Sequence, residues 1–132
     1  MSHRILQPSG WPRPRGYSNG ISARGRQVYV AGQIGWDSEG VLAGADLVTQ
    51  ARQALRNIVD IIATDGARPE HIVRLTWYVV NRQAYLDSSG PLGEAYREVI
   101  GSHYPAMSAF EVSALMESGA LVEIEATAVV PE

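Results

Sequence analysis

The chain has 132 residues, of which 45% are hydrophobic and 19% are charged, and its net charge is −3 at pH 7. These values predict a single globular domain over residues 1–132, and the acidic balance gives no overall attraction to nucleic acid or anionic lipid. The absence of cysteine excludes disulfides, thiolate metal ligands and a cysteine nucleophile. All 11 basic residues are arginines, so a lysine Schiff base, and with it covalent pyridoxal phosphate, is excluded as well.

Neither a targeting segment nor a metal site is indicated. The first residues lack the apolar core of a signal peptide, and no apolar run approaches the roughly 18 residues of a membrane span. The three histidines are scattered, without the spacing of metal ligands, and no glycine-rich phosphate loop is present. We therefore expect a cytoplasmic protein without membrane contact, metal or cofactor.

The N-terminal third predicts an arm followed by strands. Prolines punctuate residues 1–15, which favours an irregular arm. Residues 16–22 and 26–36 have the spacing of a hairpin around a turn at residues 24–26, and the second segment is rich in β-branched and aromatic side chains. A further turn follows, with a short strand expected at residues 41–42.

Two helices are expected next, separated by a strand. From Asp46 to about Asp65, apolar residues recur at three- and four-residue spacing, with Asp46 as the N-cap and Gly66 as a stop signal. Residues 71–80 are rich in β-branched and aromatic side chains and predict a strand. A second helix is expected to begin near Pro91, because proline suits the first helical turn.

Residues 106–112 and 121–130 are expected to close the chain as two strands. In the last one, apolar residues alternate with Glu123 and Glu125, so one face is apolar and the other carries both carboxylates. Helices between consecutive strands imply right-handed crossovers, which place both helices on one face of the sheet. The opposite face is partly apolar and would stay uncovered in a monomer. We therefore expect it to pack against other subunits, with Glu123 in or beside that interface.

Motifs from about Gly16 to Val130 resemble those of the Rid (YjgF-like) family, also known as endoribonuclease L-PSP or translation initiation inhibitor proteins. The segments that carry the resemblance are VYVAGQIGWDSEG, QARQALRNIVDIIATDGARPEHIVRLTWYV, and YPAMSAFEVSAL followed by VEIEATAV. The resemblance implies an α+β domain with a chorismate-mutase-like fold, in which two helices back one face of a six-stranded, mostly antiparallel sheet. It also implies a homotrimer with a ligand site in each subunit cleft. The activity it implies is hydrolysis of reactive enamines and imines, such as 2-aminoacrylate, to 2-keto acids and ammonia.

The resemblance places the two expected catalytic groups. A glutamate on the last strand of family members, which positions or activates the attacking water, falls on Glu123. A tyrosine that follows a glycine near the N-terminus falls on Tyr17, which we expect to hold the substrate nitrogen or an oxygen. From the residues alone, a solvated or ion-paired strand residue is the favoured interpretation of Glu123, whereas Tyr17 is equally a half-buried strand tyrosine.

A turn after the second expected strand supplies further substrate-binding positions. In the resemblance, the Gly-Gln-Ile turn that borders the site falls on Gly32, Gln33 and Ile34, and the serine that often precedes it is Ala31 here. Trp36 follows directly. It is either a core aromatic or an apolar wall for a larger, flatter ligand, and we expect the wall.

The carboxylate anchor of the family is missing from its usual place. The arginine that binds the substrate carboxylate through a bidentate salt bridge falls on Met107, and the small polar position two residues later is Ala109. Losing such a contact removes on the order of 2–5 kcal/mol when the carboxylate is buried. The substrate is therefore expected to differ from 2-aminoacrylate, unless another arginine replaces the missing one. The candidate replacements are Arg15, Arg24, Arg26 and Arg74, each of which is otherwise a solvated surface arginine.

Several functions are consistent with these residues. The first is a hydrolase for an imine or enamine that is larger and depends less on a carboxylate, as in family deaminases that act on 2-aminomuconate. The second is a trimer that binds a small apolar ligand or a partner without turnover. The third is an endoribonuclease or translation inhibitor, for which five arginines before Gln27 would form a basic arm, although the net acidity argues against it. Chorismate mutase activity would rest on the fold alone.

Overall fold

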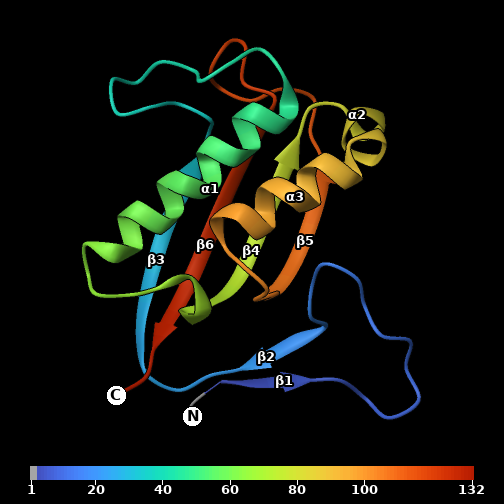
Figure 1. Cartoon of the computed structure of the whole chain (residues 1–132), viewed down its shortest axis with the longest axis vertical. Helices are drawn as coiled ribbons and strands as arrows, with labels where there is room; N and C mark the ends of the chain where they lie inside the picture. The colour runs from blue at the N-terminus through green and yellow to red at the C-terminus, as the bar shows by residue number, and fades with distance from the viewer. Residues whose placement is uncertain (1–2) are drawn as a thin grey trace.

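A four-stranded mixed sheet forms the centre of the molecule (Figure 1). The computed structural model describes residues 3–132. The strand order is β3 (Arg26–Gln33), β6 (Val122–Val130), β4 (Ile72–Val79) and β5 (Ala106–Glu111). β6 is antiparallel to both of its neighbours, whereas β4 and β5 are parallel. The expected strands at residues 71–80, 106–112 and 121–130 are thereby confirmed.

Helices cover one face of this sheet, as the sequence predicts (Figure 1). α1 (Leu47–Ala63) begins where the side chain of Asp46 accepts a hydrogen bond from the backbone N–H of Thr49, so the predicted N-cap is confirmed. The second helix differs from the expectation. It begins at Ser89 as α3 (Ser89–Val99), and a separate short helix, α2 (Arg82–Asp87), precedes it. Asn81 caps α2 by accepting a hydrogen bond from the N–H of Ala84, and this cap explains the earlier helix start. A short 3₁₀ turn, η1 (Pro69–His71), leads into β4.

The hydrophobic core lies between α1, α3 and the sheet. Val122, Ile124 and Ala128 of β6 are fully buried, which confirms that the apolar face of the last strand meets the helices. We call this side of the sheet the helix face and the opposite side the outer face. Burying these apolar side chains away from water stabilises the sheet against the helices.

Gln50 is a fully buried polar residue on α1. Its Nε2 donates to the carbonyls of Gly44 (2.9 Å) and Gly119 (3.0 Å), and its Oε1 accepts from the N–H of Leu121 (2.8 Å). These bonds satisfy backbone groups of two loops that would otherwise lack partners. They also fix the point at which the chain enters β6.

The N-terminal third of the chain differs from several expectations. Arg4–Leu6 forms β1, which pairs with β2 (Gly20–Ser22) in a separate two-stranded antiparallel sheet. β2 therefore does not form a hairpin with β3, and the six strands make two sheets rather than one. The first 15 residues are not wholly irregular, because their prolines lie beyond β1, in the long loop that joins it to β2. Residues 41–42 form no strand; Leu42 makes only an isolated bridge with Trp36.

The outer face carries no helix (Figure 1). Tyr29 is 72% exposed and Phe110 is 53% exposed there, beside half-buried Glu123 and Glu125. Among residues 3–132, no helix has both the length and the apolar character needed to cross a bilayer.

Candidate functional site

The carboxylate of Glu123 lies across the backbone of Gly32. A Cβ placed on Gly32 would lie 2.7 Å from Cδ of Glu123 and closer still to its Oε2. Any larger residue at position 32 would therefore displace this side chain, so glycine is required for the observed position of the carboxylate. The register of β3 against β6 shifts between Val30 and Gln33, and this irregularity brings Gly32 to the glutamate.

A second carboxylate and a tyrosine lie near Glu123 on the outer face. Tyr78 pairs with Glu123 across the strands, and its hydroxyl donates to Oε1 of Glu125 at 2.6 Å. This hydrogen bond, followed by partial burial and the two carboxylate charges, raises the pKa of Tyr78. Tyr78 therefore stays protonated at neutral pH and binds Glu125, which leaves Glu123 as the carboxylate that lies over Gly32.

The remaining residues around the Gly-Gln-Ile turn do not all face Glu123. Ala31 is exposed on the outer face, and the side chain of Gln33 donates to its carbonyl at 3.1 Å. Ile34 is buried in the molecule and Trp36 is 38% exposed. The carbonyls of both Ile34 and Trp36 accept hydrogen bonds from Asn57 on α1, which holds the turn against the helix.

Met107 and Ala109 lie on the other side of the sheet. In β5 they pair with Leu75 and Trp77 of β4, which point toward the helices. Met107 packs against the hydrophobic core, whereas Ala109 is exposed at the edge strand. Since Glu123 is on the outer face, with β4 between β6 and β5, one protomer does not bring Glu123 and Met107 together.

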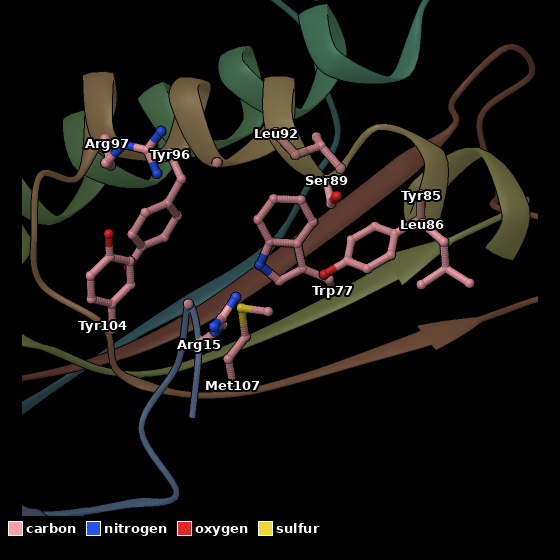
Figure 2. A pocket seen from close by; sticks show the side chains of 12 residues that line it. Arg15, Trp77, Tyr85, Leu86, Ser89, Leu92, Tyr96, Arg97, Tyr104 and Met107 are labelled. Atoms are coloured by element: carbon pink, nitrogen blue, oxygen red, sulfur yellow. The ribbon is translucent and has the colours of Figure 1, made fainter. Parts of the chain in front are cut away.

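Met107 lines a cavity of about 270 Å³ between β5, the two C-terminal helices and the end of the N-terminal arm (Figure 2). We call it the aromatic cavity. Trp77 and Tyr85 meet edge to face with ring centroids 6.0 Å apart, and Tyr96 stacks on Tyr104 at 5.4 Å. Its lining residues are Arg15, Gly16, Trp77, Tyr85, Leu86, Ser89, Leu92, Gly93, Tyr96, Arg97, Tyr104 and Met107.

The aromatic cavity carries positive charge and no carboxylate. Arg15 and Arg97 both line it, and neither forms an ion pair with any residue in the described part of the chain. Burial raises the pKa of Tyr85 and of Tyr96, so both hydroxyls are neutral at neutral pH.

Sequence reasoning identified this region only in part. It named Met107 and offered Arg15 as one of four candidate arginines, but it singled out neither Trp77 nor Arg97 as a site residue. Leu92 and Tyr96 lie four residues apart on α3, a spacing that indicates a buried helix face but does not distinguish a packed face from a cavity wall.

Tyr17 lies on the arm beside the edge of β5. Its neighbour Ser18 bridges to Ala106 in parallel, and Ser18 N–H donates to the carbonyl of Pro105 at 3.0 Å. Tyr17 is 39% exposed and lines a second hollow together with His103 and Tyr104, whereas it does not line the aromatic cavity. Within residues 3–132 no group of three or more histidine, aspartate or glutamate side chains is placed to hold a metal ion.

Comparison with known proteins identifies the class to which this fold belongs. The family model described as endoribonuclease L-PSP matches residues 12–130. The solved structure of YyfB, a protein of the conserved Rid family from Yersinia pestis, matches with a TM-score of 0.87 at 33% identity and covers 98% of this chain and 100% of that one. The chain therefore belongs to the Rid, or endoribonuclease L-PSP, family, and the resemblance found in the sequence is confirmed.

Relatives with named activities are also similar to this chain. It is 32% identical over 131 residues to the 2-iminobutanoate/2-iminopropanoate deaminase of Capra hircus, covering 98% of this chain and 91% of that protein. It is 32% identical over 105 residues to the human protein of the same name, covering 79% of this chain and 73% of that protein.

Proposed function

We propose that the protein hydrolyses the C=N bond of a small imine or enamine, releasing ammonia and a carbonyl compound. The observation that carries this proposal is the position of the Glu123 carboxylate over Gly32, on the open face of the sheet. Deaminases of 2-imino acids among the relatives support it.

Glu123 would act on the water that attacks the imine. The carboxylate accepts a proton from water while the oxygen adds to the imine carbon and the C=N electron pair moves to nitrogen. Transfer of protons to that nitrogen then allows the C–N bond to break, so that ammonia leaves and the C=O bond forms. An enamine is first protonated at carbon, which gives the imine, and the imine is then hydrolysed by the same steps.

A second copy of the chain would complete the site. Glu123 lies on the outer face and Met107 on the helix face, so a cleft that contains both requires two protomers. The outer face exposes Tyr29 and Phe110, and burying them in a homotrimer would remove apolar surface from water. In that arrangement Tyr17, on the arm beside β5, would contact the substrate from the second hollow, which shares Arg15, Gly16 and Tyr104 with the aromatic cavity.

The substrate would be larger and less polar than 2-aminoacrylate. Ala31, Met107 and Ala109 replace two small polar groups and the carboxylate-binding arginine implied by the resemblance, and none of them can bind a carboxylate through its side chain. An apolar wall at Met107 favours a substrate with a hydrophobic side chain, because such a group gains free energy on leaving water.

The test compares two glutamates on the same face of β6. Glu123→Gln keeps the shape of the side chain but removes the base, and we expect hydrolysis of imines formed in situ from hydrophobic amino acids to fall by about 10²-fold or more. Glu125→Gln is the matched control, with a small effect expected. Light scattering reports the oligomeric state of both variants. An unchanged rate in Glu123→Gln, with the assembly intact, would remove the proposal.

A trimer that binds a ligand without turnover is the second candidate. The apolar residues at positions 31, 107 and 109 favour it, because each removes a polar group from the region where the chemistry would occur. A binder raises the melting temperature in the presence of its ligand while no product forms. Release of ammonia from any imine, lost in Glu123→Gln, would rule out this candidate.

A further inference from the structure

Arg15 and Met107 line the same cavity. Of the four arginines that could replace the missing one, Arg15 alone lines the aromatic cavity. Arg26, the first residue of β3, forms an ion pair with Asp65. Arg74 lines a hollow on the outer face together with Glu125. Figure 2 shows the Arg15 guanidinium and the Met107 side chain among the residues that line the cavity.

Trp77 supplies an independent sign that a ligand belongs there. Its indole is 3% exposed, and Nε1 is a buried donor without a hydrogen-bond partner among the described residues. Buried N–H groups nearly always have a partner, because a lost hydrogen bond to water is otherwise not replaced. The nitrogen edge of the ring is turned toward the Arg15 end of the cavity (Figure 2), and an acceptor from a ligand would satisfy it once the groups that cover the nitrogen move aside.

The remaining walls define the rest of such a ligand. Trp77, Tyr85 and Leu92 offer flat or apolar surface, with the Met107 thioether beside them. The volume of about 270 Å³ corresponds to about nine water molecules at roughly 30 Å³ each, which exceeds what 2-aminoacrylate would fill. No carboxylate lines the cavity to oppose an anion, and burial keeps Tyr85 and Tyr96 neutral at neutral pH.

We propose that Arg15 and the Trp77 indole N–H bind the carboxylate of an aromatic ligand in this cavity, which makes the imines of aromatic 2-keto acids the substrate class. The carboxylate anchor is thus moved from position 107 to the N-terminal arm, and the space gained admits a ring. The choice of an imine rests on the proposed function, whereas binding of the carboxylate does not.

Binding is measured with 3-phenylpropionate, a stable carboxylate, on the inactive Glu123→Gln protein. We expect binding by calorimetry, with Arg15→Gln raising Kd about 10- to 100-fold, because a charged hydrogen-bonded contact is lost. Arg82→Gln is the matched control: it removes the same charge from α2, near Tyr85, without touching the cavity. The neutral 3-phenylpropanol should bind weakly to all variants and show no dependence on Arg15.

The indole signal of Trp77 gives a second readout that needs no change in the cavity. The chain has three tryptophans, and loss of one indole N–H resonance in Trp77→Phe assigns its signal. We expect this resonance to shift with 3-phenylpropionate and to stay in place with 3-phenylpropanol. Equal Kd values for Arg15→Gln and Arg82→Gln, or an unmoved Trp77 resonance at saturation, would overturn the assignment of this anchor.

The two proposals fail in different ways. If Arg15-dependent binding is observed while no imine is hydrolysed by the unmodified protein, the ligand site stands and the hydrolase is wrong. If imines are hydrolysed at the same rate by Arg15→Gln, for phenylalanine-derived and alanine-derived imines alike, the hydrolase stands and the anchor is wrong.

Discussion

Gly32→Ala should remove the hydrolytic activity that we assign to Glu123 without unfolding the protein. The new methyl group would lie 2.7 Å from Cδ of Glu123, far inside van der Waals contact, so the carboxylate must leave its position. The obstacle is the end of a flexible side chain on an open face, and Gly32 does not have a positive φ, so the backbone can accept alanine. We expect the free energy of unfolding to change by less than about 1 kcal/mol, because the smaller entropy of the unfolded alanine chain offsets the local rearrangement.

The expected loss of activity is much larger than this change in stability. Displacing a reacting group by about 1 Å costs on the order of 10²-fold in rate, and the methyl group forces a displacement of at least that size. The assay is ammonia release from an imine formed in situ, with urea unfolding measured on the same samples. Gly32→Ala with the activity of the unmodified protein would refute the role given to Glu123, because the carboxylate cannot keep its position beside an alanine.

Gly35→Ala is the matched control: here we expect a loss of stability, whereas Gly32→Ala should leave stability nearly unchanged. A Cβ at position 35 would lie 2.5 Å from Cα and 2.6 Å from the carbonyl oxygen of Gln50, and this backbone cannot move aside without disturbing α1. We expect it to destabilise the protein by about 1–3 kcal/mol, which lowers Tm by roughly 4–12 °C in a domain of this size.

Three other changes test separate parts of the structure. Met107→Arg restores the family's anchor and should raise kcat/KM for 2-aminoacrylate at least about tenfold; no gain in an intact assembly would mean that the alanines at positions 31 and 109 matter as much. Gln50→Leu leaves two carbonyls and the Leu121 N–H without partners, so it should lower the free energy of unfolding, measured in urea, by about 3 kcal/mol. The control is Gln53→Leu, at a partly buried position on the same helix, for which the same measurement should show a loss of less than about 1 kcal/mol. Burial raises the pKa of Tyr96, so the folded state holds the phenol proton more tightly than the unfolded state does. Its contribution to stability is complete below about pH 10 and is lost as the pH rises above that value, where the unfolded phenol ionises. Urea unfolding between about pH 9 and about pH 11 should therefore show a shallower fall for Tyr96→Phe, and parallel curves would contradict this account.

The order of helices and strands from α1 onward could be predicted because each element carries its own periodic signal. The three- and four-residue spacing after Asp46 and the alternation around Glu123 report which side chains must leave water, and that requirement is local. The family could be predicted for a related reason, since the Gly-Gln-Ile turn and the last strand keep their residues together in the chain.

The pairing of the N-terminal strands and the split of the second helix depended on competing local signals. Prolines within the first 15 residues suggested an arm, yet they lie after Arg4–Leu6, which remains free to pair with Gly20–Ser22. Asn81 begins a short helix before Ser88, so the start expected at Pro91 came too late.

What the sequence determined by itself is the α+β class, the family and the replacement of the expected arginine by Met107, because each of these is written in the identity and spacing of neighbouring residues. Only the tertiary structure decided that Glu123 and Met107 lie on opposite faces of the sheet, that Gly32 makes room for the glutamate, and that Arg15 and Trp77 reach one cavity. These relations depend on strand order and on the path of the arm, which bring together residues far apart in the chain. Local periodicity cannot predict which distant residues come together, because that depends on the packing of the whole sheet against its helices.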